Sequence, residues 1–322
     1  MDYNDKCRKE IINGDKFLMS KLLYKTEEEK KALNINLDDF GRVRNFKRNK
    51  FSDWCSDPIP MDIVSKRLNM DRMDNLDVQM VEVAKCNLHC WWCYLPDELR
   101  HINEKYMKWF SPQELLDLVF HENANCKCLY VSGGNPELVP ELIYDIMKEL
   151  SNRGLSDKLL LWSDDVLSTD YVFNMDIDKL KYMLQYKNYA KICCLKGFDD
   201  QSFSFNTLTK KEGFQEQLER LKKNIDLGFD TYCYVVLTCE DLENIDKRIS
   251  DFIEKLQNIS YYLPLRVIPI KIEKFSAVIE RLNDIRNQSI INQYKVLDVW
   301  NSQIEKSYSK KLIKKNISDI VL

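Results

Sequence analysis

Three cysteines lie within eight residues of one another in the segment CNLHCWWC, which runs from Cys86 through Cys90 to Cys93. Thiolates are strong ligands for zinc and for iron–sulfur clusters. A closed zinc site needs four ligands, and His89 or His101 could supply the fourth. Alternatively, three thiolates on one short loop can hold three irons of a [4Fe–4S] cube and leave the fourth iron open. The spacing therefore leaves two kinds of site to decide between.

A pair of glycines is the second chemical signal. Gly133 and Gly134 form the only tandem glycine in a chain that has eight glycines in all. Glycine lets the backbone approach a ligand because it has no side chain, although an ordinary tight turn would also use it. Asn135 follows the pair, and its carbonyl oxygen can accept a hydrogen bond from an ammonium group. By themselves, these residues leave the choice between the iron–sulfur site and the zinc site open.

Two further polar segments follow apolar runs. The first is WSDD, which contains Ser163, Asp164 and Asp165, and the second begins at Leu195 with LKGFDD and contains Lys196. Each has a simple structural alternative. The aspartates could cap the next helix, and Lys196 could be an exposed lysine at the end of a strand.

The elements that must position these residues alternate regularly. Strands are predicted over 78–84, 128–132, 158–163, 191–196, 231–238 and 265–272. Helices are predicted over 111–123, 136–154, 178–188, 212–227 and 241–257. Ser111 and Glu114 form a capping box at the start of the first helix, and Gly154 closes the second. Apolar strands that alternate with helices predict a parallel sheet covered by helices.

This pattern predicts an α/β fold, a partial (βα)6 TIM-like barrel, because six units are too few for a closed eight-stranded barrel. Loops at the carboxyl ends of the strands then build the active site, and the cysteines lie on the first of these loops. We expect three parts: an N-terminal extension at 1–75 with a helix near 15–33, the barrel core at 76–275, and a C-terminal helical segment at 276–322.

Composition excludes several classes of protein. The net charge is −3 with both signs mixed, so no broad basic face for nucleic acid is expected. No apolar run approaches the ~20 residues of a membrane span, and no signal peptide is visible, so we expect a cytoplasmic protein. Eleven cysteines in a reducing compartment should remain thiols or bind metal. Those outside the triplet are expected in the core, except Cys55, which could reach the mouth of the active site.

A C-x3-C-x2-C segment after the first strand of a six-fold βα chain resembles the radical S-adenosylmethionine (SAM) superfamily, over roughly residues 76–275. In that family the open iron binds SAM, and an electron from the cluster releases a 5′-deoxyadenosyl radical that abstracts hydrogen from the substrate. The resemblance implies an enzyme with SAM and a [4Fe–4S] cluster as cofactors. It makes Cys86, Cys90 and Cys93 the cluster ligands and a flavodoxin- or ferredoxin-like protein the electron donor. No cysteine lies beyond Cys239, so one cluster per chain is expected.

The resemblance also implies contacts with SAM. Trp92, just before the third cysteine, matches an aromatic position near the adenine. The segment from Gly133 through Gly134 to Asn135 matches a Gly-Gly-Glu-Pro type motif that meets the amino group of SAM. Asn135 replaces the usual glutamate, so one charge-assisted contact is lost.

Two later segments complete these implications. Ser163 and Asp164 are placed to touch the SAM ribose or the substrate, and Lys196 would face the SAM carboxylate. The Gly-x-Ile-x-Gly motif, which contacts adenine elsewhere in the family, is not recognisable near the fifth strand.

The substrate remains open between several classes. The segment from 195 to 207 resembles the lysine–glycine segment of relatives of glycyl-radical activating enzymes, which implies hydrogen abstraction from a peptide or protein. Such activating enzymes usually carry little sequence before the cysteine loop, whereas this chain carries 85 residues. These residues could instead help to recognise a small molecule or a nucleotide. The alternative from another class is a zinc-binding module without catalysis.

Overall fold

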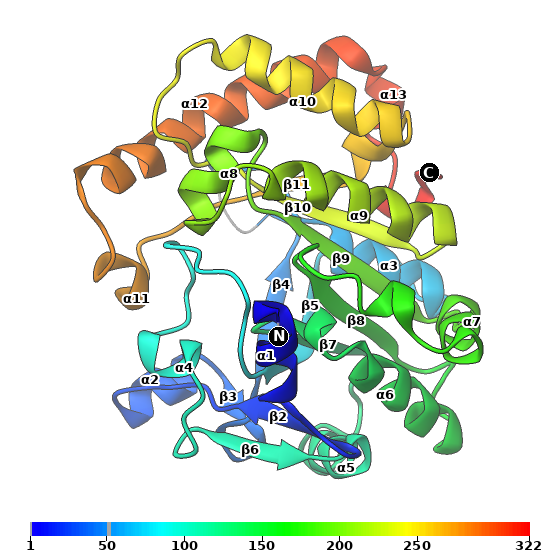
Figure 1. The fold of residues 1–322 in the computed structure, drawn as a ribbon. Helices are drawn as coiled ribbons and strands as arrows, with labels where there is room; N and C mark the ends of the chain where they lie inside the picture. Colours follow the sequence, from blue (N-terminus) through cyan, green and yellow to red (C-terminus); the bar gives the residue numbers. More distant parts are fainter. Residues whose placement is uncertain (1, 50–52) are drawn as a thin grey trace.

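One mixed sheet organises the computed structural model, which describes residues 2–49 and 53–322 (Figure 1). Its six parallel strands follow the order β5 (Asn75–Val83), β7 (Cys128–Gly133), β8 (Leu160–Asp165), β9 (Tyr189–Leu195), β10 (Thr231–Val236) and β11 (Val267–Ile270). The sheet curves without closing into a full barrel. The predicted α/β fold with a partial, TIM-like barrel is confirmed.

Helices connect the parallel strands and cover the outer face of the sheet. They are α5 (Pro112–Glu122), α6 (Pro140–Asn152), α7 (Ile177–Gln185), α9 (Gly213–Leu227) and α10 (Ile245–Ile259). The predicted capping box is present: Ser111 Oγ accepts from the Glu114 backbone N–H at 3.2 Å, and Glu114 Oε2 accepts from the Ser111 N–H at 2.7 Å. The expected crossover helices are therefore confirmed.

Neighbouring residues on a strand enter different hydrophobic clusters. Trp162 on β8 and Ile192 on β9 pack into the cluster inside the curved sheet. Leu161 and Cys193, one position away on the same strands, pack into the clusters beneath the helices. Because side chains on a strand alternate between its two faces, each of these strands carries two apolar faces, which explains the nearly continuous apolar runs.

The N-terminal residues extend the same sheet. The expected helix near 15–33 is wrong: β2 (Lys16–Ser20) and the short helix α2 (Glu27–Ala32) occupy this part of the chain. β4 (Gly41–Lys47) pairs antiparallel with β5, and β2 pairs antiparallel with β5 and with β6 (Met107–Phe110). The apolar run in β2 is buried because it pairs with strands that are distant in the sequence. The pattern of residues within the segment does not indicate these partners.

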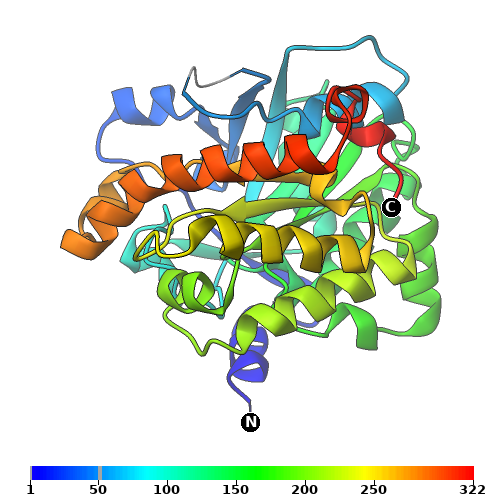
Figure 2. The same cartoon turned by 90° about the horizontal axis from the view of Figure 1, so that it is seen from above.

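The remaining N-terminal helices are α1 (Tyr3–Lys9) and α3 (Ile59–Arg67). The predicted C-terminal helical segment is confirmed as α11 (Ser276–Ile279), α12 (Asp284–Ser307) and α13 (Lys310–Ile313). Seen from above, α12, α10 and α9 lie side by side (Figure 2). Among the described residues, no helix has both the length and the apolar character needed to span a bilayer.

Candidate active site

A cavity of about 310 Å³ lies at the carboxyl ends of the parallel strands. The cysteine loop (residues 84–95), which follows β5, contributes Cys86, Cys90 and Cys93 to the wall of this cavity. Asp164 at the end of β8 and Lys196 directly after β9 line the same cavity. The structure therefore gathers residues from three separate strand ends around one space.

The two tryptophans of the cysteine loop have different surroundings. Trp91 is 1% exposed and packs with Val236, Val278 and Ile290. Trp92 lines the cavity. One tryptophan thus anchors the loop in the protein interior, and the other is available to a ligand. The sequence alone could not distinguish them.

Burial dominates the chemistry of the three thiols. It raises the pKa of Cys86 to about 11, and it also raises the pKa values of Cys90 and Cys93 above the ordinary thiol value. Such thiols ionise at neutral pH only when a bound metal displaces their protons. No group of three His, Cys, Asp or Glu side chains within 2–49 and 53–322 is arranged to hold one metal ion. A [4Fe–4S] cube does not need such a group, because each thiolate binds a different iron.

Lys196 is the buried cation of the cavity, with an exposed fraction of 7%. Burial disfavours its charge, but interactions with Cys194, Cys90 and Cys86 outweigh that effect and raise its pKa. Its Nζ lies 5.1 Å from the centre of the Trp92 ring. No carboxylate among the described residues forms an ion pair with it. A buried ammonium beside thiols fits an anionic group, such as a thiolate-bound cluster or a ligand carboxylate.

The glycine pair lies directly against the cysteine loop. Gly133 has a φ of +95°, and a β-carbon there would lie 2.6 Å from Glu82 Cβ. A β-carbon on Gly134 would lie 1.8 Å from the backbone oxygen of Lys85. Both glycines line the cavity, but it is this close backbone approach that excludes any side chain. The pair fixes where the cysteine loop begins.

Asn135 does not line the cavity. It is fully buried, and its Nδ2 donates to Asn87 Oδ1 at 2.9 Å and to Ser168 Oγ at 3.1 Å. Its Oδ1 accepts from the Glu137 backbone N–H at 3.1 Å. The Asn135 amide therefore already has hydrogen-bond partners within the protein. It links the cysteine loop to the loop after β8.

The first helix continues this network. Asn87 Nδ2 donates to Asn4 Oδ1 at 2.8 Å, and Tyr3 Oη hydrogen-bonds with His89 Nε2 at 3.3 Å. Helix α1 therefore holds the first half of the cysteine loop from outside the barrel. No motif within the first ten residues indicates this role.

Ser163 and Asp164 point to opposite faces of β8. Asp164 lines the cavity and accepts from Tyr130 Oη at 2.6 Å and from Ser132 Oγ at 2.5 Å. Burial raises its pKa, and these two hydrogen bonds oppose the rise. Ser163 lies on the helix-covered face, does not line the cavity, and hydrogen-bonds with Tyr189 Oη at 2.7 Å. Only one of the two predicted residues therefore reaches the site.

The far wall of the cavity comes from the N-terminal extension, which the motifs did not identify. Arg44 and Phe46 of β4 contribute to it, together with Cys55 and Asp57. Cys55 thus reaches the cavity, as its place in the sequence allowed, and its Sγ donates to the carbonyl oxygen of Pro269 at 3.2 Å. Within the described chain, the Arg44 guanidinium has no hydrogen bond or ion pair, and it lies 4.3 Å from the centre of the Phe46 ring.

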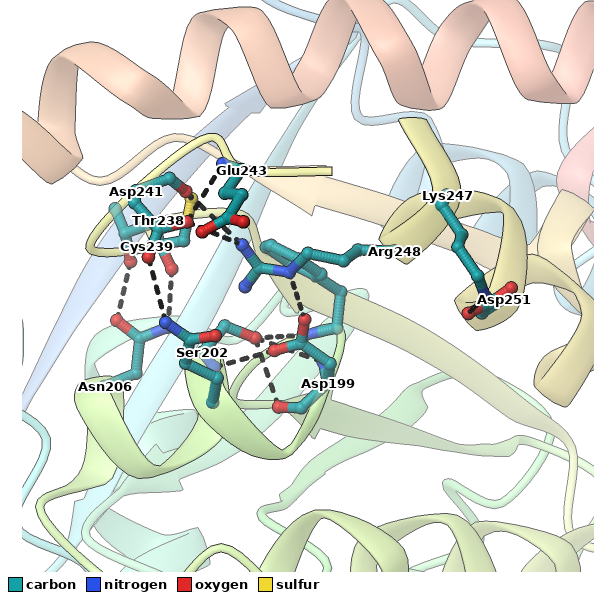
Figure 3. Close-up of polar contacts among 12 residues, drawn as sticks. Asp199, Ser202, Asn206, Thr238, Cys239, Asp241, Glu243, Lys247, Arg248 and Asp251 are labelled. Atoms are coloured by element: carbon teal, nitrogen blue, oxygen red, sulfur yellow. Dashed lines mark hydrogen bonds and ion pairs between the residues drawn. The ribbon is translucent and has the colours of Figure 1, made fainter. Parts of the chain in front are cut away.

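Helix α8 (Asp200–Thr207), which the sequence did not predict, supports the segment after Lys196 (Figure 3). Its N-cap, Asp199, accepts from Arg248 Nε of α10 at 2.6 Å. Asn206 Nδ2 donates to the backbone oxygen of Thr238 at 3.0 Å, and Thr238 Oγ1 donates back to Asn206 Oδ1 at 2.7 Å. The backbone oxygen of Asn206 also accepts from the N–H of Trp91 at 3.3 Å. Helix α8 therefore connects Lys196 with the cysteine loop.

Comparison with known proteins gives one family match. The family model of the radical SAM superfamily matches residues 83–252, just over half of the 322-residue chain. No curated protein is similar enough to match.

The solved structures that match this chain share little of its sequence. SuiB of Streptococcus suis bound to the precursor peptide SuiA is 13% identical, with a TM-score of 0.42, over 64% of this chain and 51% of that chain. Spore photoproduct lyase with bound AdoMet is 10% identical, with a TM-score of 0.43, over 72% of this chain and 74% of that one. QueE from Escherichia coli is 12% identical, with a TM-score of 0.34, over 68% and 82%. The chain spans about half the length of the SuiB chain in the peptide complex.

Proposed function

The chain belongs to the radical SAM superfamily, and on that premise we propose that Cys86, Cys90 and Cys93 hold three irons of its [4Fe–4S] cluster, leaving the fourth iron for SAM. When bound and reduced, this cluster would supply the electron that splits SAM into methionine and a 5′-deoxyadenosyl radical, the species that takes a hydrogen atom from the substrate in this family. The protein supplies ligand placement, charge and exclusion of water.

One observation carries this proposal: three thiols line one cavity at the strand ends together with a buried lysine that has no carboxylate partner among the described residues. Lys196 would offer its ammonium group to the carboxylate of SAM, and Trp92 its ring to the adenine. Asp164 would accept hydrogen bonds from the SAM hydroxyl groups. The backbone of Gly133 and Gly134 would line the methionine end, where no side chain can intrude.

We assign Asn135 a positioning role in place of direct contact with SAM. Its side chain is already bonded to Asn87, which lies between Cys86 and Leu88 in the cysteine loop. A glutamate at this position would carry a charge into a fully buried site whose partners are amides and a hydroxyl. The asparagine is therefore suited to holding the loop.

We propose a peptide or protein segment as the substrate. Cavities that bury a drug-sized ligand measure roughly 300–1,000 Å³. The cavity of about 310 Å³ is near the lower limit of that range, so bound SAM would occupy most of it. A substrate that inserts one residue from the mouth fits the remaining space better than a whole nucleotide does. Phe275, which lines the mouth and is 51% exposed, offers an apolar contact for such a segment.

A small anionic molecule is the second candidate. Arg44 supports it, because this guanidinium lines the cavity without an ion pair or hydrogen bond in the described chain. A planar guanidinium is well suited to a carboxylate or a phosphate. The two candidates predict different stimulators of SAM cleavage.

Anaerobic reconstitution tests the core of the proposal. The wild-type protein should bind iron and sulfide, become brown, and release 5′-deoxyadenosine slowly when SAM and dithionite are added. The Cys86→Ala, Cys90→Ala and Cys93→Ala variants should lose all three properties. Cys233→Ala, which removes a fully buried thiol outside the cavity, should keep them. A colourless protein with one zinc and no 5′-deoxyadenosine would overturn the proposal.

The substrate is tested with the same assay. Pools of short peptides, nucleotides and small carboxylates are added in turn, and release of 5′-deoxyadenosine is measured. Acceleration by peptides, retained in Arg44→Gln, supports the first candidate. Acceleration by small anions alone, lost in Arg44→Gln, supports the second candidate and excludes the first.

A further inference from the structure

The second half of the cysteine loop is held by residues that follow the matched family region. Val278 and Ile290 pack around Trp91, and both lie beyond residue 252, where the family match ends. The Arg286 guanidinium carbon lies 5.8 Å from the centre of the Trp91 ring. The start of the C-terminal helical segment therefore borders the loop directly.

Arg281, in the turn between α11 and α12, makes the closest polar contacts with the loop. Its Nη1 donates to the backbone oxygen of Cys93, and its Nη2 to that of Leu95, both at 2.6 Å. Its Nε and Nη2 also donate to Asp97 Oδ1, at 3.1 and 2.6 Å. Arg286 Nη1 in turn donates to the Arg281 backbone oxygen at 2.5 Å. The side chain of Arg281 is only 11% exposed.

These contacts provide hydrogen-bond donors for backbone carbonyl groups of the loop. Residues 84–95 form no helix or strand, so their carbonyl groups have no partners in regular structure. A guanidinium presents several N–H donors in a rigid plane and can bridge two carbonyls at once. Lysine carries the same charge on a flexible chain, without that planar geometry. The arrangement therefore requires arginine in particular.

We infer that Arg281 is a positioning residue for the iron–sulfur cluster, which fixes the backbone of Cys93 so that its thiolate meets the cluster. This inference rests on the proposed role of the three cysteines as cluster ligands. It also gives the C-terminal segment a function, because cluster binding then depends on residues outside the matched family region. Substitution of residues that orient metal ligands typically costs about 10- to 100-fold in metal affinity or activity.

The test compares Arg281→Met and Arg281→Lys with Arg220→Met in the full-length, anaerobically reconstituted protein. Arg220 is a matched control: it is 15% exposed, pairs with Asp170, and donates to the backbone oxygen of Leu167. Three quantities are measured: iron and sulfide per chain, the rate at which a chelator bleaches the cluster, and the electron paramagnetic resonance spectrum of the reduced cluster. Circular dichroism reports folding.

We expect both Arg281 variants to lose the cluster about 10-fold faster than wild type, with an altered spectrum of the cluster that remains. Arg220→Met should behave as wild type. Bleaching at the wild-type rate with an unchanged spectrum in Arg281→Met overturns the inference, and so does full rescue by Arg281→Lys. If Arg281→Met does not fold, Asp97→Asn removes the charge of an exposed partner of the arginine and should show a weaker effect of the same kind. A wild-type chain that binds no cluster would instead refute the proposed function.

Discussion

Two buried lysines lie five positions apart on and just after the same strand, and their surroundings differ completely. Lys191 of β9 is fully buried on the helix-covered side. Its Nζ lies 2.9 Å from Glu137 Oε1 and 3.4 Å from Asp165 Oδ2. Burial disfavours the charge of Lys191, but these carboxylates outweigh it and raise its pKa. The protein itself supplies the anions for this cation.

Lys196 is buried on the cavity side and has thiols and the Trp92 ring as neighbours. No carboxylate of the described chain pairs with it. A buried ion without a partner is costly, and such ions concentrate at functional sites. The comparison indicates that Lys191 serves the fold, whereas under the proposed function Lys196 pairs with an anion that binds from outside. Removing each charge should therefore affect different properties.

The largest effect is expected from Lys191→Met. This substitution leaves Glu137 and Asp165 buried without their cation, which should lower the free energy of unfolding by about 3–5 kcal/mol. Urea denaturation of the variant and the wild type measures the loss. Adding Glu137→Gln and Asp165→Asn to the same chain should restore most of it, because the uncompensated charges are then gone. A loss below about 1 kcal/mol for the single variant would contradict the structural role.

The next effect concerns pH. One lysine faces two carboxylates, so one negative charge is in excess, and burial raises the pKa of Glu137 to about 7 despite Lys191. The folded state therefore retains a proton between pH 4.5 and 7 that the unfolded state has released. Protonated Glu137 therefore adds to the free energy of unfolding at low pH. This contribution, up to about 3 kcal/mol, is lost as the pH rises to about 7.

Glu137→Gln should remove this part of the pH dependence. Stability curves of the variant and the wild type, measured from pH 4.5 to 8, should converge at low pH, and the variant should be the more stable protein above pH 7. Parallel curves would show that Glu137 stays ionised throughout the range.

Lys196→Met should have a smaller effect, on a different property. No ion pair is lost within the described chain, so the free energy of unfolding should change by less than about 1 kcal/mol. SAM should bind about 10-fold more weakly or worse, because a charge-assisted contact with its carboxylate is gone. Equilibrium dialysis of SAM against the reconstituted protein measures this. Lys191→Met is the matched control, and its folded fraction should keep wild-type affinity.

Much of the fold could be predicted because parallel strands buried on both faces are continuous apolar runs. The capping box at Ser111 and Glu114 marked one helix start in advance. Helix α8 carries a similar signal in Asp199 and Ser202, but a capping pattern four residues after a strand does not by itself indicate a helix. β2 and β4 could not be inferred, because their strand character comes from pairing with distant residues.

The candidate site divides in the same way. Cys86, Cys90 and Cys93 are recognisable because their spacing is local, and the structure brings all three to one cavity. Arg44 and Arg281 reach the cavity and its loop only through the tertiary fold, so no local motif could identify them. The sequence also does not tell which face of a strand a given side chain lies on. Ser163 and Asp164 at the end of β8 are an example, because both were candidates and only Asp164 lines the cavity.

Ser163→Ala should therefore have the smallest effect. The serine hydroxyl hydrogen-bonds with Tyr189 Oη on the same side of the sheet as Lys191, so its loss should cost about 1 kcal/mol of stability and leave SAM affinity within about twofold. Asp164→Asn, one residue further on, should instead weaken SAM binding, because this carboxylate faces the cavity. Urea denaturation and dialysis of both variants separate the two faces. If Ser163→Ala weakened SAM binding more than Asp164→Asn, the side of the strand that faces SAM would be assigned incorrectly, and the contrast between the two lysines would fail with it.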